Sequence, residues 1–221
     1  QLDKNSFVVD IGSNDGIFLK PLKRKGIKVL GIEPAANLAK LANKEKLTTI
    51  NAYFDSETVN QIKVEYGHAD IVTAFNVFAH SDFLKEIAEA SFDLLKKDGV
   101  FVIEVQSLAA MVEEMLFDNV YHEHVNYWSL TNLISFFQTL NLNVNDFENV
   151  DTHGGSLRVY ISRNSGQSDS VKNQLDYEEQ LQINKLETFY DFSNKLNIQK
   201  TKIYKKLETE NIKTLVVDVR N

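Results

Sequence analysis

The stretch VVDIGSNDG, residues 8–16, joins an apolar, β-branched run to a turn that holds two glycines four residues apart. Glycine adopts backbone angles that other residues avoid, and without a Cβ it lets the main chain approach a ligand closely. A helix that begins just after such a turn presents unpaired backbone N–H groups to the same place. The pattern therefore predicts a strand, a turn and a helix of an α/β domain, with a ligand bound over the turn.

Outward from this turn, apolar runs and amphipathic stretches alternate through the first 110 residues. The expected strands are residues 7–11, 28–32, 47–52, 70–75 and 100–105, and the expected helices are residues 17–25, 35–46, 57–66 and 83–96. Nearly continuous apolar strands joined by helices are typical of a parallel sheet that is covered on both faces. Because crossovers between parallel strands are right-handed, we predict a doubly wound, Rossmann-like sheet.

The pattern changes after residue 105. The next expected elements are helices at residues 107–117 and 130–140 and strands at residues 144–150 and 156–162. These two strands are close in sequence, so they are expected to pair antiparallel at one edge of the sheet. Residues 163–170 read as a linker, and residues 170–210 as one long helix or two. We therefore predict one domain over residues 1–163 and, over residues 164–221, a helical connector that ends in the opening strand of another domain at residues 214–219.

The composition excludes several functional classes. The 221 residues are 43% apolar and 25% charged, as in an ordinary soluble protein, and the net charge is −7. This charge offers no cationic field for phosphate backbones, so no nucleic-acid partner is expected. The chain has no cysteine, hence no thiolate metal site, and no apolar run long enough to cross a membrane. We expect a cytoplasmic protein without a membrane partner.

Acidic residues around the glycine turn indicate the kind of ligand. Asp10 and Asp15 stand beside the turn, and Glu33 follows the second strand, where a carboxylate can accept both hydroxyls of a ribose. A pyrophosphate favours a third glycine and no acid in the loop. Two acids suit a ligand with an ammonium and a sulfonium charge, so we predict S-adenosylmethionine rather than NAD. The alternative is a plain turn with solvated acids.

A second group of polar residues reads Tyr121-His122-Glu123-His124. Metal binding needs three or four convergent ligands, and this spacing is not the i,i+4 pair of a zinc-protease helix. A histidine base suits the pattern better, because the ordinary imidazole pKa near 6.5 allows proton abstraction at neutral pH. Glu123 or Tyr121 would then orient the base or stabilise developing charge. Metal ligation and a plain surface loop remain as alternatives.

Two further segments follow strands and are candidates for the same crevice. Asn76 and His80 come just after the fourth strand, and ligands of open α/β sheets lie over the carboxyl ends of the strands. The alternative role for His80 is capping or packing. The segment Thr152-His153-Gly154-Gly155-Ser156 is either a simple turn between two strands or a loop that contacts a substrate through His153 and its backbone amides.

Together these motifs resemble the sugar C-methyltransferases, which methylate carbon 3 of nucleotide-linked 4-keto-deoxysugars. The resemblance covers about residues 6–207 and rests on five stretches in family order, namely VVDIGSNDGIFL (8–19), GIEP (31–34), NVFAH (76–80), FDNVYHEHVNYWS (117–129) and THGGSLRVY (152–160). It implies a class I methyltransferase sheet with an antiparallel edge strand and a C-terminal helical extension. It also implies S-adenosylmethionine as cofactor and a nucleotide-linked keto sugar as small-molecule substrate.

The resemblance also implies roles for individual residues. His124 would be the base that removes a proton from the carbon next to the ketone, with Tyr121, Glu123 and His80 as catalytic helpers. The expected cofactor-binding residues are Asp10, Gly12, Asn14, Asp15, Gly16, Glu33, Pro34, Phe54 and Asn76. The expected substrate-binding residues are His122, Tyr127, His153, Gly154 and Gly155.

The chain departs from the family pattern at both ends. Family members begin with a cysteine-rich zinc domain and end with a second α/β domain, whereas this sequence has no cysteine and no metal ligand set is expected. Recognition of a nucleotide sugar is therefore less well supported than cofactor binding. Two other functions remain open, namely a methyltransferase acting on oxygen or nitrogen of another small molecule, and a cofactor-binding module without activity.

Overall fold

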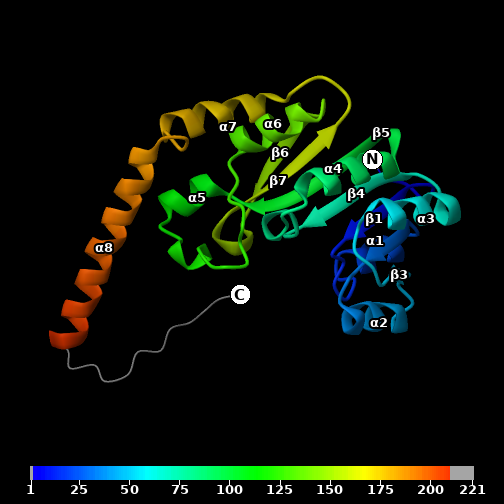
Figure 1. Cartoon of the computed structure of the whole chain (residues 1–221), viewed down its shortest axis with the longest axis horizontal. Helices are drawn as coiled ribbons and strands as arrows, with labels where there is room; N and C mark the ends of the chain where they lie inside the picture. Colours follow the sequence, from blue (N-terminus) through cyan, green and yellow to red (C-terminus); the bar gives the residue numbers. More distant parts are fainter. Residues whose placement is uncertain (1, 210–221) are drawn as a thin grey trace.

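The computed structural model describes residues 2–209, whose centre is a single twisted sheet (Figure 1). The strand order of this seven-stranded sheet is β3-β2-β1-β4-β5-β7-β6. The strands are β1 (Phe7–Ile11), β2 (Lys28–Ile32), β3 (Thr49–Ile50), β4 (Ala69–Phe75), β5 (Leu95–Gln106), β6 (Asn143–Val150) and β7 (Ser156–Ser162). The first five strands run parallel to one another, and β7 runs antiparallel to both β5 and β6.

Helices follow most of the strands. They are α1 (Leu19–Arg24), α2 (Ala36–Lys44), α3 (Ser56–Tyr66), α4 (Leu84–Leu94), α5 (Leu108–Glu113), α6 (Leu130–Thr139), α7 (Asp169–Gln180) and α8 (Leu186–Thr209). Three short 3₁₀ turns, η1 (Phe78–His80), η2 (Phe117–Asn119) and η3 (Thr152–Gly154), lie in the loops. The predicted doubly wound, mostly parallel sheet with an antiparallel strand near one edge is confirmed. The reversed strand, β7, is second from the edge, and β6 forms the edge itself.

The alternation of side chains along β1 explains why both faces of the sheet are covered. Val9 and Ile11 point into the larger core with residues of α3 and α4, whereas Val8 packs with Leu19 of α1 and Ala42 of α2. A parallel strand that is buried on both faces needs this continuous apolar sequence. The result is a rigid strand whose carboxyl end carries the glycine turn.

An aromatic cluster anchors the loop after β4. Phe78 of η1 is fully buried and stacks at 6.0 Å between ring centroids on Phe137 of α6, with Phe101 and Trp128 also within aromatic contact. Such ring pairs contribute beyond their buried area. This packing anchors the segment that carries two candidate site residues, Asn76 and His80.

Some element boundaries differ from the predicted ones. β3 has two residues instead of six, because the Asn51 side chain donates to the carbonyl oxygens of Glu33 and Pro34 and turns the chain away from the sheet. β5 begins at Leu95, directly after α4, because Leu95 already pairs with Ala69 before a bulge. The predicted strand at residues 214–219 lies outside the described residues.

Between residues 169 and 209 the chain forms two helices rather than one. α7 packs back on the sheet domain, where the Glu178 carboxylate accepts the backbone N–H groups of Leu130 and Thr131 and so caps α6. α8 then extends away from the sheet (Figure 1). The predicted domain boundary at residue 163 falls just after β7 and stays a prediction. Among the described residues, no helix is both long and apolar enough to cross a membrane.

Candidate functional site

The glycine turn after β1 brings three loops together at the carboxyl end of the sheet. Gly12 has φ +65°, and a Cβ built on it would lie 2.7 Å from Cγ2 of Val77 in the loop after β4. The backbone N–H groups of Gly12 and Ser13 both donate to the carbonyl oxygen of Ile32 at the end of β2. A side chain at position 12 would force the loops apart, so the turn requires glycine.

A cavity of about 1130 Å³ opens at this junction. Among the predicted site residues, its lining includes Gly12, Glu33, Pro34, Phe54, Asn76 and His80. Apolar walls with a few convergent polar groups are typical of cofactor sites. The structure therefore brings the predicted adenosine-binding residues and one predicted catalytic helper to a single cavity.

One wall of this cavity was not foreseen. Four acidic residues line it, namely Asp82 just before α4 and Glu86, Glu89 and Asp93 within α4. Asp93 pairs with Lys63 at 2.6 Å, and Glu89 lies 3.8 Å from Lys85. In the sequence these acids stand three and four residues apart, and this spacing indicates one acidic face of a helix. This wall makes the cavity more suitable for a cation than for a polyphosphate.

Glu33 is buried at the cavity and held by the backbone. One carboxylate oxygen accepts the N–H of Asn14 at 2.9 Å, and the other accepts the N–H of Ala35 at 2.8 Å. Each oxygen keeps a further lone pair. Two preset acceptors at the end of β2 fit the paired hydroxyls of a ribose.

Asp10 lies beneath the turn and does not line the cavity. It is 4% exposed, and its Oδ1 accepts the Thr73 hydroxyl at 2.6 Å. Burial raises the pKa of Asp10 to about 7, with the nearby Glu33 charge adding to the rise and the Thr73 hydrogen bond opposing it. This carboxyl group therefore titrates near neutral pH.

The rest of the predicted turn residues lie outside the cavity lining. Asp15 pairs with Lys20 at 3.0 Å, and Lys20 also reaches Glu45. Asn14 has φ +53°, a left-handed conformation that asparagine tolerates better than most residues. Gly16, with φ +83°, packs against Leu47. In this structure the three residues shape the turn, and only the Asn14 amide touches Glu33.

The predicted base, His124, is held between a tyrosine and a backbone carbonyl. Its Nδ1 lies 2.9 Å from the Asn119 carbonyl oxygen, and its Nε2 lies 3.0 Å from the Tyr121 hydroxyl. A carbonyl oxygen only accepts, so Nδ1 must carry the proton and the neutral ring has its lone pair on Nε2. The Tyr121 hydroxyl then donates to that lone pair.

The protonation states of this pair suit a base and a donor. Burial lowers the pKa of His124, the Asn119 hydrogen bond opposes this, and His80 and His153 lower it further. Burial and the nearby Glu123 charge raise the pKa of the Tyr121 hydroxyl. At neutral pH His124 is therefore an uncharged base and Tyr121 keeps its proton.

Backbone hydrogen bonds join the loop of His124 to the loop of His80. The Val125 N–H donates to the Ala79 carbonyl at 3.1 Å, and His80 Nδ1 donates to the Glu123 carbonyl at 2.9 Å. The two imidazole rings lie 4.8 Å apart between centroids. His80 lines the cavity, whereas Tyr121 and His124 do not; the predicted base lies next to the cavity through its contact with His80.

The remaining predicted residues surround His124 less tightly. Tyr127 donates a long hydrogen bond of 3.4 Å to the Asn119 carbonyl, while the side chains of His122 and Glu123 are largely exposed. His153 has φ +52° in the η3 turn, followed by Gly154 and Gly155. The segment of residues 121–123 is exposed, although Trp128 enters the main core and Tyr127 packs, partly buried, against a smaller apolar cluster.

Two residues that shape the site, Asn119 and Glu104, were not predicted from the sequence. Asn119 acts through its backbone carbonyl, for which no sequence signal exists. Glu104 is a buried acid inside the apolar run of residues 100–105 in β5, and an acid within such a run is the feature of the sequence that indicates it. Among residues 2–209, no group of three or more potential metal ligands is arranged to hold an ion.

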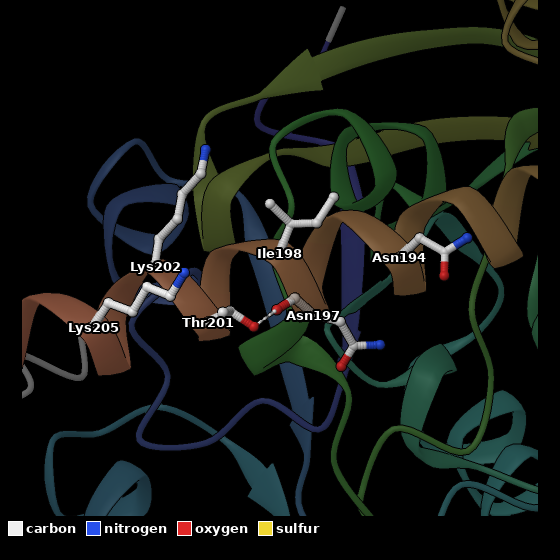
Figure 2. Close-up of a pocket in the computed structure, with 6 residues that line it drawn as sticks. All are labelled: Asn194, Asn197, Ile198, Thr201, Lys202 and Lys205. Atoms are coloured by element: carbon white, nitrogen blue, oxygen red, sulfur yellow. Dashed lines mark hydrogen bonds between the residues drawn. The ribbon is translucent and has the colours of Figure 1, made fainter.

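A second hollow lies on α8 and, unlike the cavity at the sheet, is lined by a single helix (Figure 2). Its lining residues are Asn194, Asn197, Ile198, Thr201, Lys202 and Lys205. All of them belong to one helix, so this hollow has a single wall. None of the predicted site residues borders it.

Sequence comparisons match the chain to two family models. Residues 1–146 match the model described as a methyltransferase domain, and residues 151–217 match a C-methyltransferase C-terminal domain. A curated relative, the C-methyltransferase NovU of Streptomyces niveus, is 36% identical over 161 residues. The match covers 73% of this chain but only 38% of NovU.

Solved structures show the same fold at low sequence identity. A SAM-dependent methyltransferase from Anabaena variabilis superposes with TM-score 0.57 at 13% identity, covering 74% of this chain and 79% of that one. Magnesium protoporphyrin IX methyltransferase from Synechocystis, solved with bound SAH, gives TM-score 0.55 at 13% identity over 71% of this chain and 74% of that one.

Proposed function

This chain belongs to the S-adenosylmethionine-dependent methyltransferase family, and from that premise we propose that the protein methylates carbon next to a ketone in a nucleotide-linked 4-keto-deoxysugar. The family assignment confirms the predicted cofactor, S-adenosylmethionine. The chain spans less than half of the curated relative, so the activity and substrate of the whole protein are proposals.

The observation that carries the proposal is the Tyr121–His124–Asn119 arrangement beside His80, which lines the cavity. Transfer to carbon requires a base for a C–H proton and a donor for the enolate oxygen that results. His124 has a free basic nitrogen whose tautomer is set by Asn119, and Tyr121 is a protonated donor beside it. Transfer to an oxygen or nitrogen nucleophile needs the base but not the paired donor.

The proton movements follow from this geometry. When the ketone binds, the Tyr121 hydroxyl turns its proton from Nε2 of His124 to the ketone oxygen. This frees the Nε2 lone pair, which takes the proton from the adjacent carbon and leaves an enolate held by Tyr121. His80, 4.8 Å from His124 between ring centroids, gives its Nδ1 proton to the Glu123 carbonyl and so holds the loop of the base in place.

The cavity residues fit the cofactor of the family. Glu33 offers two preset acceptors for the ribose, and Phe54 and Pro34 provide apolar surface for the adenine end. When bound there, S-adenosylmethionine supplies the electrophilic methyl group. The acidic α4 wall and the Gly12 turn favour a cation at this site over a nicotinamide dinucleotide.

The decisive experiment measures solvent deuterium exchange rather than methylation. The whole protein is incubated in D₂O with SAH and a nucleotide-linked 4-keto-6-deoxysugar, and deuterium at the carbon next to the ketone is followed by NMR. We expect exchange with the wild-type protein and a loss of roughly 10²–10⁴-fold in His124→Gln. Calorimetry should show that this variant binds SAH as the wild type does.

His122→Gln is the matched control, because it removes an exposed histidine two positions away. It should lose much less exchange than His124→Gln. Wild-type exchange in His124→Gln would remove His124 as the base. An absence of exchange in the wild type, with SAH bound, would favour methyl transfer to oxygen or nitrogen instead.

A further inference from the structure

Glu104 is a buried acid that the proposed reaction does not use directly. It sits near the carboxyl end of β5, within the apolar run of residues 100–105, and is 4% exposed. Taking a carboxylate out of water is costly, and well-packed apolar residues often replace buried ion pairs without loss of stability. A buried acid at this place therefore calls for an explanation from its partners.

The strand register places Glu104 in a row across the sheet. Phe75 of β4 pairs with Glu104, Glu104 pairs with Arg158 of β7, and Arg158 pairs with Glu148 of β6. Arg158 donates to Oε2 of Glu104 through Nε at 3.1 Å and Nη2 at 2.9 Å, and its guanidinium lies over the Phe75 ring. With Glu148 also 3.7 Å away, Arg158 is committed to carboxylates and is not a free anion site.

The rest of Glu104 reaches both loops of the candidate site. Its Oε1 accepts the Thr152 hydroxyl at 2.8 Å, and its backbone carbonyl accepts the N–H of Asn76 at 2.9 Å. Thr152 begins the turn that carries His153, and Asn76 lines the cofactor cavity. One residue thus connects the two loops.

The Thr152 turn is a strained segment that needs such support. His153 has φ +52°, an unfavourable backbone conformation for most residues with a side chain. The Thr152 carbonyl accepts the Gly155 N–H at 2.9 Å and the Ser156 hydroxyl at 3.0 Å, so Thr152 closes the turn. The Thr152–Glu104 bond ties this closed turn to the sheet.

We propose that Glu104, clamped by Arg158, is a positioning residue that holds the Thr152–Gly155 turn in place for the sugar. The proposal rests on the proposed function for its substrate. Glu104 does not contact the reacting atoms; it acts through Thr152, which sets where His153 and the Gly154–Gly155 backbone stand. Substrate recognition should depend on it, whereas cofactor binding and proton abstraction by His124 should not.

The test compares Thr152→Val with Tyr160→Phe in the whole protein. Each variant removes a single hydroxyl that donates to a carboxylate at 2.8 Å on the same sheet face, to Glu104 in one case and to Glu148 in the other. Only Thr152 belongs to the turn. Thr152→Ser keeps the hydroxyl and serves as the rescue variant.

We expect amide hydrogen exchange at Gly155 to become roughly tenfold faster in Thr152→Val, which lacks a hydrogen bond to a charged group. The KM for keto sugar in the deuterium-exchange assay should rise by a similar factor. The SAH affinity should stay as in the wild type. Thr152→Ser should restore both altered values, and Tyr160→Phe should change neither.

Wild-type amide exchange and KM in Thr152→Val would overturn the proposal, and so would equal effects of Thr152→Val and Tyr160→Phe. If the wild-type protein shows no carbon deuteration at all, the proposed function fails. The Gly155 amide measurement still decides the positioning role in that case, because it needs no sugar.

Discussion

The Tyr121 hydroxyl lies 3.0 Å from Nε2 of His124, on the opposite side of the ring from the Asn119 carbonyl that holds Nδ1. The two contacts set the imidazole tautomer and aim a proton donor at the basic nitrogen. This arrangement couples a base to a donor in one unit. We therefore expect that loss of the base, His124, and loss of the donor, Tyr121, affect the reaction differently.

Tyr121→Phe removes the donor and leaves the base. We expect carbon deuteration to fall roughly 100-fold, the usual cost of losing one group that stabilises an oxyanion. The loss should appear in kcat, because the hydroxyl acts on the developing enolate. The measurement is the deuterium-exchange assay with SAH. Tyr127→Phe, which removes only a 3.4 Å hydrogen bond to Asn119, is the control and should change kcat far less.

The pH dependence of the reaction should report His124. Burial lowers the pKa of His124 below its ordinary 6.5, so the base stays deprotonated through neutral pH. The deuteration rate should be level around pH 7 and should decline only as acid protonates His124. His80→Asn removes a like charge that lowers this pKa, so the decline should move to higher pH. If the pH profile does not move in His80→Asn, then His80 does not affect the pKa of His124.

Cofactor affinity should depend on Glu33 and not on Asp15. Glu33 accepts two backbone N–H groups at the cavity, whereas Asp15 pairs with Lys20 outside it. Glu33→Gln should weaken SAH binding by ~1–3 kcal/mol, the cost of a charged hydrogen-bond acceptor. Asp15→Asn should leave the affinity close to that of the wild type. The measurement is calorimetry of SAH binding. Equal losses of affinity in Glu33→Gln and Asp15→Asn would show that Asp15 contributes to the cofactor site as well.

Asp10 should make the protein less stable as pH rises. Its pKa is raised from 3.8 to about 7, so the folded protein keeps a proton that the unfolded chain has lost. This stabilising contribution is complete below about pH 4 and is lost as the pH rises through about 7, a total of roughly 4 kcal/mol. Asp10→Asn cannot ionise and lacks this dependence. Urea unfolding of both proteins from pH 4 to 8 should give a difference curve of this sign, and a flat curve would contradict the burial of Asp10.

The amino-acid sequence predicted most of the fold because its signals are local. Apolar runs such as Phe7–Ile11, the glycine turn at residues 12–16 and the amphipathic helices each depend on neighbours in the chain. Boundaries were less predictable where a distant partner ends or extends an element. Asn51 ends β3 by bonding to Glu33 and Pro34, and Ala69 extends β5 back to Leu95.

The doubly wound sheet, the glycine turn and the residue types that point to a methyl donor and a histidine base can be predicted from the amino-acid sequence alone, because strand and helix periods and motif chemistry lie in consecutive residues. Which of these residues come together depends on the folded chain. It places Asn119 on Nδ1 of His124, Glu104 between two loops, and Asp10 out of the cavity. Hydrogen bonds between residues far apart in the chain, and the burial that shifts a pKa, arise only when folding brings these groups together.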